Sequence, residues 1–229
     1  MKQKAVKSRY YIKKEIDLII VKINILRQNY YIFRKLYFVD GYQNIGKFIP
    51  HTLNFINIAL LDKIIIELYK IVADKDKNVL SIPNFLKEFH NHRCDFREQK
   101  YIYVKDIDSS KKERLYLDTN ELEKDIQELE VFLENNKKII DYIKKDRNKI
   151  IAHNDKKMTF KKNYKPKELR TVIVYKELSD FIDELFSKMN NIYCTMYKTQ
   201  YAYLEETDSE LKHLNNILED EKKKYEIND

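Results

Sequence analysis

Apolar residues along this chain recur in alternating steps of three and four, which keeps one stripe of an α-helix facing a single partner. The pattern predicts four long helices, over about 8–37, 51–72, 118–151 and 176–204. A shorter helix is expected to open at Ser81, with Pro83 in its first turn. The expected inward positions of the first, second and fourth long helices are Ile12, Ile16, Ile19, Ile23, Leu26, Tyr30, Phe33, Tyr37; Leu53, Ile56, Leu60, Ile64, Leu68, Ile71; and Leu178, Ile182, Leu185, Met189, Ile192, Met196. Long seams with short connections are typical of an all-α, antiparallel helical bundle.

Two segments follow other patterns. Residues 101–104 and 115–117 are apolar and flank a polar stretch, so they either pair as a hairpin or belong to one long loop. Residues 209–224 are more polar and predict an extra C-terminal helix. The sequence therefore predicts a helical domain over 1–204, followed by a polar helix and tail over 205–229.

The third long helix carries an arginine in its apolar seam. Asp118 is expected to cap this helix, with Glu121 three positions later as in a capping box. A permanent cation in an apolar stripe costs desolvation unless another group compensates it. The seam runs Leu122, Ile126, Leu129, Leu133, Asn136, Ile140, Ile143, Arg147, Ile150.

His153 follows Arg147 by six residues, near the expected end of that helix. On a continuous helix the two positions would diverge by about 120°. They converge if the helix ends near Ala152 and the chain turns, or if a symmetric dimer makes one site from both subunits. Such a pair suits RNA strand scission, because histidine moves protons near neutral pH and arginine holds a phosphate with two hydrogen bonds. The alternative is structural: Arg147 pairs with an acid, and His153 caps the helix.

Composition narrows the class of protein. Only two Gly and three Pro in 229 residues argue against a turn-rich or all-β fold. No stretch approaches the ~18–20 uninterrupted apolar residues of a membrane span, and charges near the start interrupt any signal-peptide core. A cytoplasmic protein without membrane contact is expected, with Cys94 and Cys194 as reduced thiols. The formal charge of +7 suits an anionic partner such as RNA, although a codon bias toward lysine would also produce it.

The segment after His153 is basic, with Phe160 and Tyr164 among its lysines. Cations interleaved with aromatic residues suit a phosphate backbone and unstacked bases, and a solvated loop is an equal alternative. The candidate RNA-binding lysines are Lys149, Lys156, Lys157, Lys161 and Lys162. The run His90-Asn91-His92-Arg93-Cys94 offers three potential metal ligands but lacks the fourth ligand that a zinc site normally has. Neither a metal nor another cofactor is expected.

The run Arg147-Asn148-Lys149-Ile150-Ile151-Ala152-His153 resembles the signature of the HEPN superfamily: an arginine, a polar residue, and a histidine after a short gap. Extended to Asp155, it is similar to the abortive-infection branch called AbiU-like. The helix over 60–74, the segment 79–86 and the helix leading into the motif agree with that branch.

The resemblance implies a four-helix-bundle core, dimerisation near the motif, and metal-independent RNA cleavage in antiphage defence or as a toxin. It assigns Arg147 and His153 as catalytic, with Asn148 supporting them. RNA, a second copy of the chain, and an antitoxin or phage trigger protein are the implied partners. A tyrosine that an antitoxin modifies in another branch is replaced here by Asp155, which puts that form of control in doubt. Non-catalytic RNA binding, or a structural dimerisation module, remains the alternative function.

Overall fold

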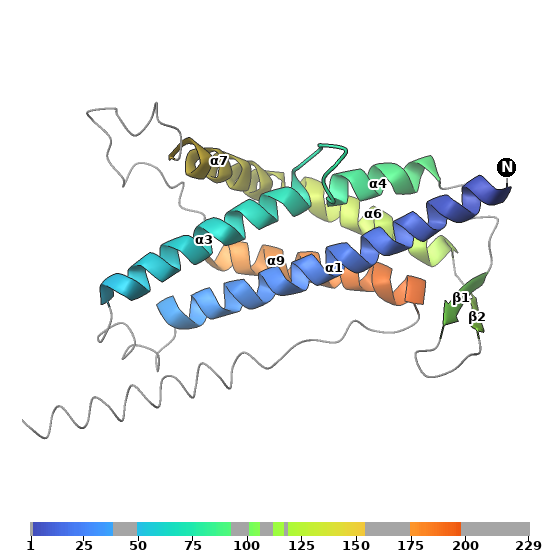
Figure 1. Ribbon diagram of the computed structural model, residues 1–229, viewed down its shortest axis with the longest axis horizontal. Coiled ribbons are helices and arrows are strands. Elements are labelled where there is room, and N and C mark those ends of the chain that lie inside the picture. The colour runs from blue at the N-terminus through green and yellow to red at the C-terminus, as the bar shows by residue number, and fades with distance from the viewer. Residues whose placement is uncertain are drawn as a thin grey trace, which may run out of the picture.

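The computed structural model describes residues 2–38, 50–92, 101–105, 112–116, 119–153 and 175–197. Within these ranges it describes the side chains of 12–35, 55–56, 58–92, 119–148 and 176–197, so the predictions for the side chains of Tyr37, Leu53 and Asp118 lie outside it. The described residues form six helices and two strands (Figure 1). The elements are α1 (Lys2–Phe38), α3 (Pro50–Val72), α4 (Ile82–Asn91), β1 (Tyr101–Lys105), β2 (Lys112–Tyr116), α6 (Thr119–Asn135), α7 (Lys137–His153) and α9 (Tyr175–Tyr197).

The long helices close a ring around one core. Helix α1 packs on α3 and α9, α9 packs on α6, and α7 packs on α3 and follows α6 in the chain. Together, α6 and α7 therefore take the place of one helix in a four-helix bundle. Figure 1 shows α1 and α3 side by side and antiparallel, with α4 lying along α1. The predicted all-α, HEPN-type bundle with a four-helix core is confirmed for the described residues.

The predicted seams are largely the buried faces. All six inward positions predicted for α9 are buried, as are Ile12 through Phe33 on the α1 seam. Apolar burial of this extent is the main force holding such helices together. One inward assignment is wrong: the side chain of Ile56 is 42% exposed. Its neighbours Phe55 and Ile58 in the first half of α3 are exposed as well, and the described buried residues of this helix begin at Leu61.

The predicted single helix over 118–151 is wrong, because it is interrupted at Asn136 and forms α6 and α7. The Asn136 side-chain amide donates to the carbonyl oxygen of Phe132 at 2.9 Å, and the Asn136 backbone N–H donates to the same oxygen at 3.1 Å. A side chain that competes for a backbone acceptor in this way favours a bend. The buried face then passes through Phe132, while Leu133 and Ile140 are only half-buried.

Local signals at shorter elements agree with the structure. Ser81 caps α4, its hydroxyl oxygen accepting from the backbone N–H of Asn84 at 3.4 Å, and Pro83 lies in the first turn. Of the two alternatives for the 101–117 region, the hairpin is confirmed: β1 and β2 pair antiparallel, with Tyr101 opposite Tyr116. The predicted helix over 209–224, and with it the boundary at 204/205, lies outside the described residues.

Polar contacts fix α1 against α9. The guanidinium of Arg27 donates to the carboxylate of Asp183 at 2.7 Å and lies 4.6 Å from the ring centroid of Phe186. Arg34 donates to the hydroxyl of Ser179 at 3.2 Å. Among the helices that the structure describes, none is both long and apolar enough to cross a lipid bilayer.

Candidate functional site

Arg147 lies on α7 against the C-terminal half of α3. Its guanidinium carbon is 4.7 Å from the ring centroid of Tyr69, so the cation faces the aromatic ring. The side chain is half-buried. A cation over an aromatic ring keeps favourable electrostatics where water is partly excluded. The compensation that the seam arginine requires is therefore supplied by an aromatic ring of another helix.

Tyr69 was not identified from the sequence. It follows the seam residue Leu68, and the chain has 18 tyrosines. No local pattern distinguishes Tyr69 from the others. Its contact with Arg147 joins residues 78 positions apart and depends on how α3 packs on α7. Only the tertiary structure reveals this pairing.

Asn148 adjoins the arginine. One terminal guanidinium nitrogen of Arg147, Nη1, donates to the side-chain oxygen of Asn148 at 3.1 Å. The Asn148 side chain is exposed, whereas the carboxylate-bearing Asp146 on the other side is only 8% exposed. Among the described side chains of α7, Asp146 is thus the most buried charged residue, while Arg147 is half-buried, as is the seam residue Ile140. Arg147 is held on one face by a ring and at one nitrogen by an amide, which leaves other N–H donors for a ligand.

His153 is the last residue of α7, and its side chain lies outside the described residues. Because helical backbone continues from Arg147 to position 153, the two positions differ by about 120° around the axis and about 9 Å along it. The helix ends at His153, close to the expected end near Ala152, and the segment that follows lies outside the described residues. Whether the two groups meet through a turn of one chain or across a dimer therefore stays a prediction.

The remaining sequence candidates are separated from this arrangement or lie outside it. The RNA-binding role of the candidate lysines stays a prediction, because they lie outside the described residues. This holds for the side chain of Lys149 and for the whole of Lys156, Lys157, Lys161 and Lys162. His90 pairs with Glu130 at 2.8 Å, and His92 lies 3.6 Å from Glu88. These two histidines contact different carboxylates, and the described part of the chain contains no group of three potential metal ligands.

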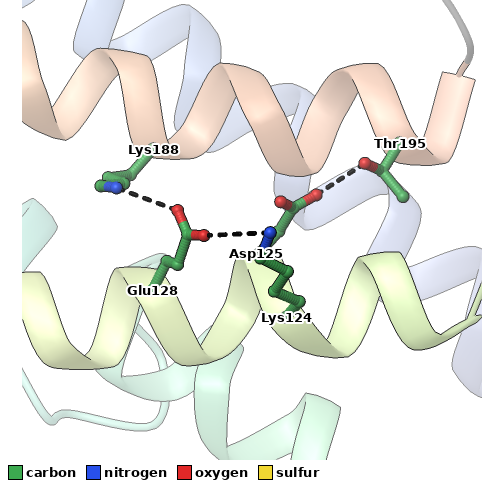
Figure 2. A network of polar contacts seen from close by, with 5 residues as sticks. All are labelled: Lys124, Asp125, Glu128, Lys188 and Thr195. Atoms are coloured by element: carbon green, nitrogen blue, oxygen red, sulfur yellow. Dashed lines mark hydrogen bonds and ion pairs between the residues drawn. The ribbon is translucent and has the colours of Figure 1, made fainter.

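A second polar cluster joins α6 to α9 (Figure 2). The hydroxyl of Thr195 donates to the carboxylate of Asp125 at 2.6 Å, while Lys188 donates to Glu128 at 3.0 Å. Burial raises the pKa of Asp125, and the hydrogen bond from Thr195 partly opposes this shift. Burial also raises the pKa of the Cys194 thiol, with the charge of Asp125 adding to the effect. This cluster fixes two helices, and its thiol is not activated.

Replacing Asp125 by Asn is expected to stabilise the protein slightly at pH 7. The pKa of Asp125 is raised in the folded state, so the protonated carboxyl contributes to the free energy of unfolding at pH values below the unfolded-state pKa near 3.9. This contribution is lost as the pH rises through the folded-state pKa. Because the group is only half-buried and solvent screens its charge, the gain is discounted to about 0.5 kcal/mol or less, roughly 1 °C in Tm. Thermal unfolding at pH 7 and pH 3.5 checks this: the difference between variant and wild type should vanish at the lower pH.

Comparison with known proteins adds one finding. The family model HEPN_AbiU2, described as AbiU2, matches residues 46–214, which include every described element from α3 to α9. No curated protein and no solved structure matches the chain. The family match spans about three-quarters of the 229 residues and contains Arg147, Asn148 and His153. The chain therefore belongs to the AbiU2 family of HEPN proteins.

Proposed function

We propose that this protein is a metal-independent endoribonuclease of a bacterial abortive-infection or toxin system, acting in the cytoplasm. The observation that carries the proposal is the environment of Arg147. Its guanidinium lies against Tyr69 and Asn148, one and a half turns before the helix end that bears His153, within the AbiU2 match. A cation held at its face and at one nitrogen can still offer N–H donors to a phosphate.

The reaction that suits these groups is transfer of the phosphoryl group to the neighbouring ribose oxygen. His153 removes the proton from the 2′-hydroxyl, and the 2′-oxygen then forms a bond to phosphorus. The bond from phosphorus to the 5′-oxygen breaks, and that oxygen receives a proton, leaving a 2′,3′-cyclic phosphate on one fragment. Arg147 stabilises the negative charge that grows on the phosphate oxygens. Asn148 orients the guanidinium through its side-chain oxygen.

A symmetric dimer would complete this site. One histidine cannot be both the base that takes the first proton and the acid that gives the second in a single step. Two α7 ends meeting across a two-fold axis would supply two His153 side chains and bring each within reach of an Arg147. The divergence of positions 147 and 153 on α7 supports this arrangement.

A structural role is the competing reading, and one observation favours it: Arg147 links α7 to α3 through Tyr69. On that reading the arginine fixes the packing of two helices, and RNA is bound without cleavage or not bound at all. The two functions differ in what happens to RNA when the fold is left intact.

The deciding experiment incubates purified protein with total RNA, with and without EDTA, beside His153→Ala. Wild type should produce fragments ending in a cyclic or 3′-phosphate, and EDTA should not reduce their yield. Complete loss with chelator would refute the metal-free mechanism. Equal fragmentation by His153→Ala would show that the cleavage does not come from this site.

Replacing Tyr69 by Leu is expected to slow RNA cleavage by roughly 10-fold, since a half-buried cation–π contact contributes about 1–2 kcal/mol to holding the guanidinium. Tyr69→Phe keeps the ring face and should retain at least half of the wild-type rate. Single-turnover rates and Tm values of both variants provide the measurement. If Tyr69→Leu and Tyr69→Phe cleave RNA equally well, the ring does not position Arg147 for catalysis.

A further inference from the structure

One face of α7 carries a half-buried tyrosine flanked by two exposed lysines. Lys138 precedes Tyr142 by four residues and Lys145 follows it by three, so the three side chains lie on one face of the helix. Their ammonium nitrogens are 5.8 Å and 5.7 Å from the ring centroid of Tyr142. One aromatic ring thus gathers two cations beside it.

The ring and the cations differ in how firmly they are held. Tyr142 is half-buried and packs against the core, whereas Lys138 and Lys145 are exposed. Packing on one side holds the ring in place, while the lysines keep their charged ends in water. A fixed aromatic surface bordered by mobile cations is the arrangement that proteins use to bind single-stranded nucleic acid.

The two ammonium groups are available to an anionic ligand. Within the described residues, neither Lys138 nor Lys145 is paired with a carboxylate, whereas their neighbour Lys137 contacts Glu134 at 3.0 Å. Of the two acids on α7, Asp141 is exposed and Asp146 is buried. The exposed charge along this part of the helix is therefore mostly positive.

From this cluster we propose that Tyr142, Lys138 and Lys145 form a subsite that binds the single-stranded RNA flanking the cleaved bond, with a base stacked on Tyr142 and phosphates held by the two lysines. The inference rests on the proposed function. Tyr142 precedes His153 by 11 residues, about 16 Å along the helix axis. An RNA strand lying along α7 can therefore contact both Tyr142 and His153. Position 149 continues the stripe that starts at Lys138, in steps of four, three and four residues.

Binding measurements on His153→Ala protein, which keeps labelled RNA intact, test the proposal. The probes are a labelled 12-nucleotide single strand and the same sequence as a duplex. Their binding is measured by fluorescence anisotropy across a salt series. In this background, Tyr142→Leu should weaken single-strand binding about 10-fold and leave duplex binding within about 2-fold, because stacking needs an unpaired base. Tyr142→Phe keeps the ring face and should bind both probes as the parent does.

The lysines are tested as a pair. Lys138→Gln with Lys145→Gln should weaken binding and flatten the plot of log affinity against log salt by about 1.4, the value for two lost phosphate contacts on a single strand. The matched control, Lys63→Gln with Lys87→Gln, removes the same charge from exposed positions on α3 and α4 and should leave the slope unchanged. Because the lysines are exposed, this pair stays informative even if Tyr142→Leu fails to fold.

The outcomes separate the subsite from the function. If RNA is bound and wild type cleaves it, but the Tyr142 and lysine variants behave like the control pair, the subsite is wrong and the proposed function stands. Equal losses on single strand and duplex would overturn base stacking. If wild type neither binds nor cleaves RNA, both the proposed function and the subsite are wrong. Tight binding of an acidic protein in place of RNA would also overturn the proposal.

Discussion

His153→Ala is expected to abolish RNA cleavage while leaving the protein folded and its subunit association unchanged. Removing a side chain that transfers protons in the reaction should lower the rate by at least ~100-fold. The residue ends α7, where truncation should cost about 1 kcal/mol or less in the free energy of unfolding. Cleavage of total RNA, the Tm and the mass from light scattering are measured on the same preparation.

Arg147→Ala is the companion to that variant and should differ in one respect. It should also lose cleavage, but the loss of the contact with Tyr69 should lower stability by about 1 kcal/mol, roughly 2–4 °C in Tm. Arg147→Lys keeps the charge and loses the paired donors, so it should cleave poorly. If His153→Ala stays folded and cleaves RNA at the wild-type rate, the catalytic assignment is wrong. A monomeric wild type at micromolar concentration would contradict the two-chain site.

Phe181→Ala is expected to give the largest loss of stability, about 3–5 kcal/mol, or roughly 10 °C in Tm. Phe181 on α9 is 2% exposed, and its ring stacks on that of Phe132 on α6 with centroids 5.3 Å apart. Truncation would leave a cavity between α6 and α9. Thermal and urea unfolding measure the change.

The matched control is Val131→Ala, one residue before Phe132 on the same helix. Val131 is 59% exposed, so its truncation should change the free energy of unfolding by no more than about 0.5 kcal/mol. A loss below 1 kcal/mol for Phe181→Ala would mean that the α6–α9 contact does not form as described.

The periodic parts of the fold were predictable because helix burial repeats every 3.6 residues. On α9, the positions from Leu178 to Met196 that the pattern marks as inward are all buried. The cap at Ser81 was also predictable, since a hydroxyl before an apolar run satisfies a free backbone N–H. Both signals are local, and local signals need no knowledge of neighbouring helices.

Features that depend on competition or on tertiary packing were not predictable. The seam continues through Asn136 without a gap in its spacing, yet the Asn136 amide competes for the Phe132 carbonyl and the helix divides. Ile56 has the spacing of a core residue but is exposed, as are its neighbours Phe55 and Ile58. Periodicity predicts which residues share one face of a helix. It does not predict what packs against that face.

The candidate site divides in the same way. Arg147, Asn148 and His153 were identified from the motif, and the structure places the first two in contact. Tyr69 could not be found, because its partner is on another helix. The two lysines beside Tyr142 follow ordinary helical spacing, but the half-burial of the ring that distinguishes this cluster from a solvated face comes from packing.

The family match begins after α1, yet α1 closes the ring by packing on both α3 and α9. A fragment restricted to residues 46–214 would expose those faces of α3 and α9 that α1 covers, and exposed apolar stripes of that kind promote aggregation. We therefore expect residues 46–214 of this protein not to fold stably by themselves. Transplanting this region into another chain, or comparing it with a relative that has a different first helix, requires a substitute for α1.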